Sequence, residues 1–308
     1  MFEDGHDRTA GKVYTNGHPY DQTRPTFTGN SDPNHFLAHI LSYLETPPYL
    51  RTKLFGLHPD FQYAGALPSL DMPHHQRVDE WCRYREGITL ESAQRGEDNN
   101  DLRTDQSKKR KKMGHDAPGS KPNTLVNVGF PDPVSLPTSI PANTRVTVEF
   151  TDELAPGSQE APSKVIPVAP SEPREKAGYY WGYNVRPASS LSTVLTECPF
   201  DGGYDLTVGT SERGVPISTL QNPSPDAPPV PQFNHMLVVF GGIAGLEGAV
   251  EADEELQKMG VDGPQSLFDY WVDLCPGQGS RTIRTEEAVW IGLMGLRNIV
   301  LSRGIKKS

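Results

Sequence analysis

The last quarter of the chain carries the pattern that most constrains the fold. The loop Cys275–Ser280 reads Cys-Pro-Gly-Gln-Gly-Ser, follows the partly apolar segment 266–274 and leads into a helix expected to start near Arg281. A strand, a glycine loop and a helix N-terminus in this order leave backbone N–H and C=O groups open to a small polar ligand. Segments 204–214 and 236–242 have the same character. These three units predict one nucleotide-like site built from loop backbone.

Bulk properties favour a loop-rich protein of roughly two domains of about 150 residues each. The 308 residues include 29 Gly and 29 Pro, which cluster in a few segments. No apolar run reaches the ~18 residues of a membrane span, and the first residues lack the apolar stretch of a signal peptide. Three widely spaced cysteines form neither a zinc-knuckle pattern nor a disulfide framework. We therefore expect a reducing, intracellular compartment.

The charge is unevenly distributed. The net charge of −10 argues against nonspecific coating of nucleic acid, but residues 103–112 hold six basic side chains, whereas 247–255 is acidic. A local basic face still binds RNA, because affinity depends on the phosphates that are neutralised locally. The run 108–112 fits a nuclear localisation signal or an RNA tether, and equally a solvated surface run.

The first half of the chain predicts helices followed by a small β-barrel. Residues 1–31 are expected to be a poorly ordered lead-in, and Asp32 caps a helix that ends before Pro47-Pro48, with a further helical turn at 49–55. From residue 88 the pattern changes to short strands, interrupted by the charged stretch 91–123, which is best read as a disordered loop. The predicted strands are 88–90, 125–129, 145–150 and 164–168.

The second half returns to α/β character. A helix of small residues is expected at 188–194, then the three strand–loop units, with 222–229 as a surface excursion. The last helix is predicted from about Thr285 to Leu301, because apolar residues recur there at helical spacing and acidic residues occupy its first turn. The barrel is thus inserted between two parts of an α/β domain.

Several motifs together resemble one family. They are Gly-Thr-Ser-Glu-Arg-Gly at 209–214, Val-Val-Phe-Gly-Gly at 238–242 and the long motif from Cys-Pro-Gly-Gln-Gly-Ser to Glu-Glu-Ala at 275–288. The chain resembles the SPOUT-class RNA methyltransferases of eukaryotes and archaea that carry an inserted OB-like barrel. The resemblance covers about 32–303 outside the two low-complexity insertions. Shorter matching pieces are 49–51, 71–75, 85–87 and 177–183.

The resemblance implies an α/β fold with a SPOUT trefoil knot, a rare exception to the rule that chains are unknotted. It assigns 32–85 and 178–308 to the methyltransferase domain and 86–177 to the OB-like β-barrel, with 91–123 as its disordered loop. Family members begin this domain with a strand and a helix before a second strand. Here residues 1–4 resemble only the end of that second strand, so the first strand and helix have no counterpart.

The resemblance also implies that S-adenosylmethionine binds in the knot. Arg213 would contact its carboxylate end, unless it is a solvent-exposed turn arginine, and Gly241 would let backbone approach the adenosine, unless it only ends a strand. Leu274 and Cys275 would grip the adenine through their backbone. Cys275 is not expected to be a nucleophile, because no His neighbours it in sequence.

The remaining site residues lie in the loop and at the helix start. Gly277 and Gly279 would let the loop turn around the donor, with helix capping as the alternative, and Ile283 would cover one adenine face. Arg284 is the expected catalytic residue, nearest the acceptor and stabilising a deprotonated base. The alternative is that Arg281 and Arg284 bind phosphates or pair with the acidic residues that follow them.

Two further clusters have simpler readings. His74 and His75 have no additional metal ligand at plausible spacing, so we expect a satisfied loop pair and no metal. The aromatic cluster at 179–183 is expected to pack at a domain junction rather than to stack on unpaired bases.

The sequence therefore predicts an S-adenosylmethionine-dependent RNA methyltransferase. The expected target is a base nitrogen such as uridine N3, or a ribose hydroxyl, of structured or ribosomal RNA. We expect a homodimer in the nucleus or nucleolus, without membrane or metal partners. A catalytically inactive RNA- or protein-binding scaffold of the same fold is the alternative. An ordinary phosphate-binding loop is disfavoured, because Ser280-Arg281 does not supply the Lys-Ser/Thr pair.

Overall fold

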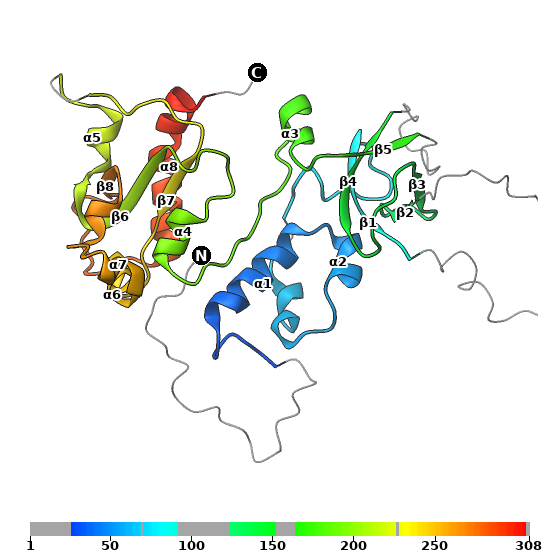
Figure 1. Ribbon diagram of the computed structural model, residues 1–308, viewed down its shortest axis with the longest axis horizontal. Helices are drawn as coiled ribbons and strands as arrows, with labels where there is room; N and C mark the ends of the chain where they lie inside the picture. The colour runs from blue at the N-terminus through cyan, green and yellow to red at the C-terminus, as the bar shows by residue number, and fades with distance from the viewer. Residues whose placement is uncertain (1–25, 69, 92–123, 152–163, 226–227, 306–308) are drawn as a thin grey trace, which may run out of the picture. The chain divides into compact units, whose positions relative to one another are not determined.

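The chain divides into two compact units. A computed structural model describes residues 26–68, 70–91, 124–151, 164–225 and 228–305 (Figure 1). Of these, 39–185 form one unit, and 186–305 form the other together with 28–38. The domain limits expected from the sequence group 32–85 with 178–308, which differs from this division into two units. Those limits stay a prediction. The basic run 108–112, nearly all of the loop 91–123 and most of the lead-in 1–31 lie outside the described residues.

Short helices begin the described chain. Helix α1 (Pro33–Glu45) starts as predicted, because the Asp32 carboxylate accepts a hydrogen bond of 2.8 Å from the His35 backbone N–H. Helix α2 (Pro48–Leu54) has proline at its first position, which needs no N–H donor. The 3₁₀ turns η2 (Pro59–Phe61) and η3 (Ala64–Ala66) follow. Across the described chain, no helix combines the length and the apolar character that crossing a bilayer requires.

The unit 39–185 contains a five-stranded antiparallel sheet with strand order β3-β2-β1-β4-β5. Its edge strands β3 and β5 also contact each other, so the sheet is nearly closed into a barrel around an apolar core that includes Val126, Val148 and Phe150. The strands are β1 (Tyr84–Thr89), β2 (Thr124–Asn127), β3 (Val134–Leu136), β4 (Arg145–Phe150) and β5 (Val165–Val168). The short helix α3 (Glu172–Ala177) follows β5.

A buried polar network joins the barrel to the end of α1. The Arg145 guanidinium, on β4, donates to Glu45 at 2.6 and 3.0 Å and to Glu86 at 2.7 Å. Glu86 also accepts from Thr147 and from the Trp181 indole N–H. Burial by itself would raise the pKa of Glu45, but hydrogen bonds and charge from His74 and Arg145 lower it to about 2. This carboxylate is therefore ionised in the folded protein.

The unit that ends at residue 305 is built on a parallel sheet with strand order β7-β6-β8. The strands β6 (Leu206–Pro216), β7 (Met236–Val239) and β8 (Tyr270–Asp273) confirm the three predicted strand–loop units. Apolar residues of α8 (Thr285–Arg303), among them Leu296 and Ile299, pack against β6 and β8. The other helices are α4 (Leu191–Thr196), α5 (Ile217–Gln221), α6 (Gly245–Ala252), α7 (Glu254–Lys258) and the 3₁₀ turn η4 (Pro264–Leu267).

Helix α8 (Thr285–Arg303) confirms the last helix predicted from about Thr285, whereas the start near Arg281, directly after the glycine loop, was wrong. The backbone of Arg284 is still extended, with φ −69° and ψ 146°, and its N–H donates to the Glu287 carboxylate at 3.2 Å. This hydrogen bond, in which the side chain of the third helical residue accepts from the backbone just before the helix, is a capping interaction that sets the helix start at Thr285. Residues 281–284 thus form a non-helical segment between the glycine loop and the helix.

Strand β6 leaves β8 and returns to it within a few residues. Val272 pairs with Thr210 and again with Val215, so residues 211–214 form an excursion from the ladder. At Gly214 the two backbones touch, because a Cβ there would lie 2.4–2.6 Å from backbone atoms of Val272 and Asp273. Only a residue without a side chain fits where the two backbones lie this close.

We predict that Glu45→Gln makes the protein less sensitive to acid. Because the folded pKa of about 2 lies below the ordinary value of 4.5, the stabilisation is fully present above pH 4.5 and is lost as the pH falls towards 2. At neutral pH the variant should lose about 2 kcal/mol of unfolding free energy, measured by urea denaturation. Glu175→Gln, at an exposed position on α3, is the control. Parallel acid profiles for wild type and Glu45→Gln would refute the network's role.

We also predict that Gly214→Ala destabilises the unit that ends at residue 305 by about 3 kcal/mol, because the new methyl group meets backbone that cannot rotate away. Gly279→Ala is the matched control, since nothing lies within 4 Å of its added Cβ. Thermal unfolding followed by circular dichroism measures both variants. Equal melting temperatures would show that the two backbones are further apart than described.

Candidate functional site

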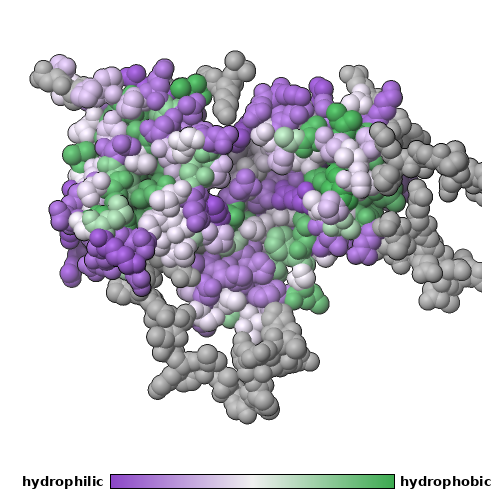
Figure 2. All heavy atoms as spheres, in the orientation of Figure 1, coloured by the Kyte–Doolittle hydropathy of each residue, from purple (hydrophilic) through white to green (hydrophobic). Residues whose placement is uncertain are grey.

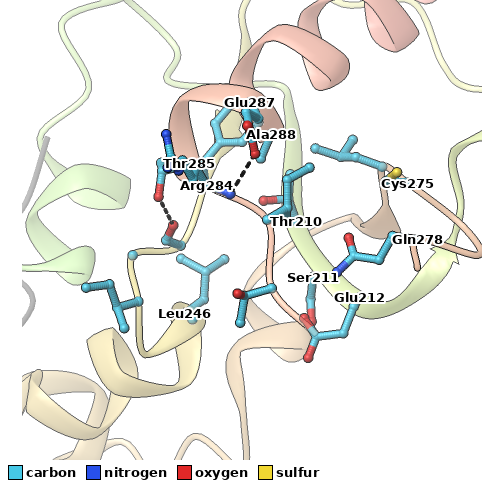
Figure 3. A pocket seen from close by; sticks show the side chains of 18 of the residues that line it. Thr210, Ser211, Glu212, Leu246, Cys275, Gln278, Arg284, Thr285, Glu287 and Ala288 are labelled. Atoms are coloured by element: carbon cyan, nitrogen blue, oxygen red, sulfur yellow. Dashed lines mark hydrogen bonds between the residues drawn. The ribbon is translucent and has the colours of Figure 1, made fainter. Parts of the chain in front are cut away.

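A cavity of about 800 Å³ lies where the three parallel strands end. Its walls come from the loop after each strand and from the start of α8, as Figure 3 shows. The size falls within the range of about 300–1,000 Å³ typical of small-molecule sites. The lining residues are 210–213, 240–247, 273–275, 278 and 281–288.

Two hydrogen bonds hold the walls together. The Thr210 hydroxyl donates to the carbonyl of Val239 at 2.9 Å, which joins the ends of β6 and β7. The Thr285 hydroxyl donates to the Gly241 carbonyl at 3.3 Å and so links the start of α8 to the β7 loop (Figure 3). Neither threonine was singled out from the sequence, because threonine at a strand end or helix start is common and its partner is distant in the chain.

Arg213 lines the cavity from the β6 excursion and is 72% exposed. Its guanidinium lies 3.2 Å from the carboxylate of Glu247 on α6 and 3.9 Å from that of Glu212. An ion pair this exposed contributes little to stability, about 0–1 kcal/mol. The guanidinium can therefore exchange Glu247 for another anionic partner at low cost.

The β7 and β8 loops bring three of the expected residues to the cavity. Gly241, Leu274 and Cys275 all line it. The Cys275 backbone N–H donates to the side chain of Asp273 at 2.9 Å, and the Cys275 carbonyl accepts from the Gln278 N–H at 3.1 Å. A carbonyl oxygen has two lone pairs, so the Cys275 carbonyl can accept one further hydrogen bond from a ligand.

Gly277 and Gly279 belong to the same loop but are not among the lining residues. Gly277 has a φ of 77°, a left-handed conformation that glycine adopts without strain. Gly277 thus forms a turn in the loop. Gln278, which lies between the two glycines, lines the cavity.

The non-helical residues 281–284 before α8 complete the lining of the cavity. Ile283 is half-buried and Arg281 and Arg284 are exposed. Within the described part of the chain, neither guanidinium has a hydrogen bond or ion pair, so the expected alternative of pairing with Glu286 or Glu287 is not observed. Glu287 instead accepts from the backbone of Arg284. Both cations are available to a ligand.

The cavity is acidic on balance. Five carboxylates line it, those of Glu212, Glu247, Asp273, Glu286 and Glu287, against the three guanidiniums of Arg213, Arg281 and Arg284. Such a lining favours a ligand that carries a positive charge, while the two unpaired guanidiniums offer separate contacts for an anion. The site can therefore accommodate a cationic small molecule beside an anionic one.

The other clusters of the sequence analysis have structural roles. His74 is fully buried, and its Nε2 lies 2.8 Å from the backbone carbonyl and 3.0 Å from the carboxylate of Glu45. The expected satisfied pair is met only in part, because the buried Nδ1 atoms of His74 and His75 have no hydrogen-bond partner among the described residues. In the aromatic cluster, Trp181 donates to Glu86 and the Tyr183 hydroxyl donates to the carbonyl of Leu41. Tyr180 remains 57% exposed.

Comparison with known proteins adds independent information. A family model described as "Putative RNA methyltransferase" matches residues 2–296. The chain is 43% identical over 270 residues to a human 28S rRNA (uridine-N(3))-methyltransferase, covering 88% of this chain and 62% of that protein. A Drosophila melanogaster protein of the same description is 42% identical over 262 residues, 85% of this chain and 46% of the relative. The chain thus spans about half to three-fifths of the length of these relatives.

Proposed function

We propose, starting from the fact that the chain belongs to the putative RNA methyltransferase family, that it transfers a methyl group from S-adenosylmethionine to RNA. The observation that carries this proposal is the cavity at the ends of β6, β7 and β8. It combines the size of a small-molecule site, walls of loop backbone and a net negative lining. The donor is itself cationic at its sulfonium sulfur, so the charge of the cavity is complementary to it.

The residues of the three loops fit this donor. Arg213 would bind its carboxylate, since the present ion pair with Glu247 is exposed and weak. The carbonyls of Leu274 and Cys275 would accept from the adenine amino group, and Ile283 would cover the ring. Gly241 would allow close backbone approach, with the turn at Gly277 and Gly279 shaping the loop. The support for each assignment is the position of the residue in or beside the lining.

The acceptor we propose is the N3 atom of a uridine in large-subunit ribosomal RNA. The support is the description of the human and Drosophila relatives as 28S rRNA (uridine-N(3))-methyltransferases. The nucleolus, where ribosomal RNA is made, is the corresponding location. A ribose hydroxyl is the less favoured acceptor, because neither of these two descriptions names one.

Arg284 is the proposed catalytic residue. When bound, S-adenosylmethionine supplies an electrophilic methyl group on a sulfonium sulfur. For the N–C bond to form, the uracil N3 would first lose its proton to solvent and would then accept the methyl group, whose bonding electrons would stay on the sulfur. The unpaired Arg284 guanidinium would stabilise the negative charge on the uracil, and Arg281 would bind a flanking phosphate.

A trefoil knot in this unit is also part of the proposal. Its support is the parallel order β7-β6-β8 together with the excursion 211–214, whose backbone lies directly against that of β8 at Gly214. The nearly closed five-stranded sheet supports an OB-like barrel that positions the RNA. Tyr179 and Tyr180, exposed residues that follow α3 in the same unit, are candidates for base stacking.

We further propose that the protein is a homodimer formed through α8. This helix is apolar on two sides: one side is buried in the unit and the other is exposed. Figure 2 shows the hydropathy of one face of the molecule, on which apolar patches alternate with polar ones. The exposed apolar side chains of α8 include Trp290 at 73%, Met294 at 68% and Leu293 at 57%. A surface of this kind is typical of an interface between subunits.

We predict that Arg284→Ala lowers the rate of methyl transfer about 100-fold while donor affinity changes less than about twofold. Transfer of labelled methyl groups to total RNA from cells lacking the protein measures the rate, and calorimetry measures donor binding. Arg174→Ala, an exposed arginine on α3, is the control. Donor and RNA binding without transfer by the wild type would favour the inactive scaffold instead.

We predict that Trp290→Glu converts a dimer to monomers, because a charge cannot be buried in an apolar interface without a partner. Sedimentation of the full chain measures the change. Ile166→Glu, an exposed apolar position on β5, is the control and should stay dimeric. A wild-type chain that sediments as a monomer would refute the proposed interface.

A further inference from the structure

Three side chains meet around one buried carboxylate oxygen in the unit 39–185. The Asp60 carboxylate is completely buried, and its Oδ2 lies 3.0 Å from Nδ1 of His39 and 3.3 Å from Nδ1 of His58. The two imidazole rings are edge to face, with centroids 4.8 Å apart. His39 lies on α1, and His58 and Asp60 belong to the turn η2. None of these three residues lines the cavity at the strand ends.

The contact between His58 and Asp60 is unusual for a plain hydrogen bond. The backbone N–H of Asp60 donates to Nδ1 of His58 at 3.2 Å, so this nitrogen acts as an acceptor that caps the turn. The same nitrogen faces Asp60 Oδ2, which is also an acceptor. Two acceptors at this distance repel each other unless a proton or a metal ion lies between them. A metal ion there would take the His58 Nδ1 lone pair in place of the Asp60 N–H.

The distances fit ligands of one metal ion. Zinc binds imidazole nitrogen and carboxylate oxygen at about 2.0–2.2 Å with tetrahedral geometry, which puts neighbouring ligand atoms about 3.3 Å apart. The N–O distances of 3.0 and 3.3 Å are close to this value. A mixed set of imidazoles and one carboxylate is the donor set that zinc and similar divalent transition metals prefer.

We propose that His39, His58 and Asp60 bind a divalent transition metal ion such as zinc. Helix α1 carries His35 one turn before His39, on the same side of the helix, which makes it the candidate for a fourth ligand. The sequence analysis expected no metal because it considered only His74 and His75. Here the ligands come from two separate segments, which only the fold brings together.

The surroundings suit a structural metal site. The His39 ring packs against Phe61 at 4.1 Å between centroids and also contacts Phe55. Side chains of His39 and His58 are only 21% and 19% exposed, so the imidazoles are held in place by packing. An ion here would tie α1 to the turn that follows α2 and would hold this helical segment in shape. The inference does not depend on the proposed function.

The test uses the purified full chain, stripped with a chelator and then titrated with zinc or cobalt(II). We expect about one metal ion per chain, a visible cobalt spectrum typical of tetrahedral coordination and a higher melting temperature with zinc. Asp60→Asn and His58→Gln should abolish the cobalt spectrum, with near-ultraviolet circular dichroism confirming that each variant is folded. His235→Gln, a histidine of the other unit, is the matched control and should keep it.

Absence of a cobalt spectrum in the wild type would overturn the proposal and leave a histidine–aspartate hydrogen-bonded cluster. Full cobalt binding by folded Asp60→Asn and His58→Gln would overturn it as well, since the metal would then lie elsewhere. Because the readout is spectroscopic and needs no donor or RNA, failure of methyl transfer would not affect either result.

Discussion

The contact on which the candidate site depends is the close approach of two backbones at Gly214. β6 pairs with β8, departs over residues 211–214 and pairs with β8 again, so Val272 is used twice. The excursion brings Arg213 to the cavity mouth, and the return fixes the end of β8 from which the loop 275–280 starts. A side chain at position 214 would separate the strands. The cavity walls on either side would then lose their common support.

The three strand–loop units were predictable because each is local. An apolar run followed by glycine identifies a strand end without knowledge of the partner strand, and parallel strands bring such ends to one edge. The same holds for α1, whose cap at Asp32 is three residues from its donor at His35. Six of the eight expected site residues line the cavity, and only Gly277 and Gly279 do not.

What could not be predicted depends on contacts between distant segments. β1 was expected at 88–90 but begins at Tyr84, because its charged residues Arg85 and Glu86 are buried by partners far away in sequence. Glu86 accepts hydrogen bonds from Arg145 and Trp181, and no local sequence pattern predicts such a network. β3 has only three residues and a polar one at its centre, and α6 and α7 lie in a stretch that was noted only for its acidity.

The charged side chains of the cavity are arranged so that it can bind two ligands of opposite charge. An acidic lining would repel RNA if its charge were uniform, since each phosphate is anionic. The carboxylates, however, are partly engaged: Glu247 by Arg213, Asp273 by the Cys275 N–H and Glu287 by the Arg284 N–H. Among the described residues, the guanidiniums of Arg281 and Arg284 have no carboxylate partner. Both residues lie in the non-helical segment 281–284 before α8. The late start of the helix thus matters chemically, because it leaves both guanidiniums in the non-helical segment that lines the cavity.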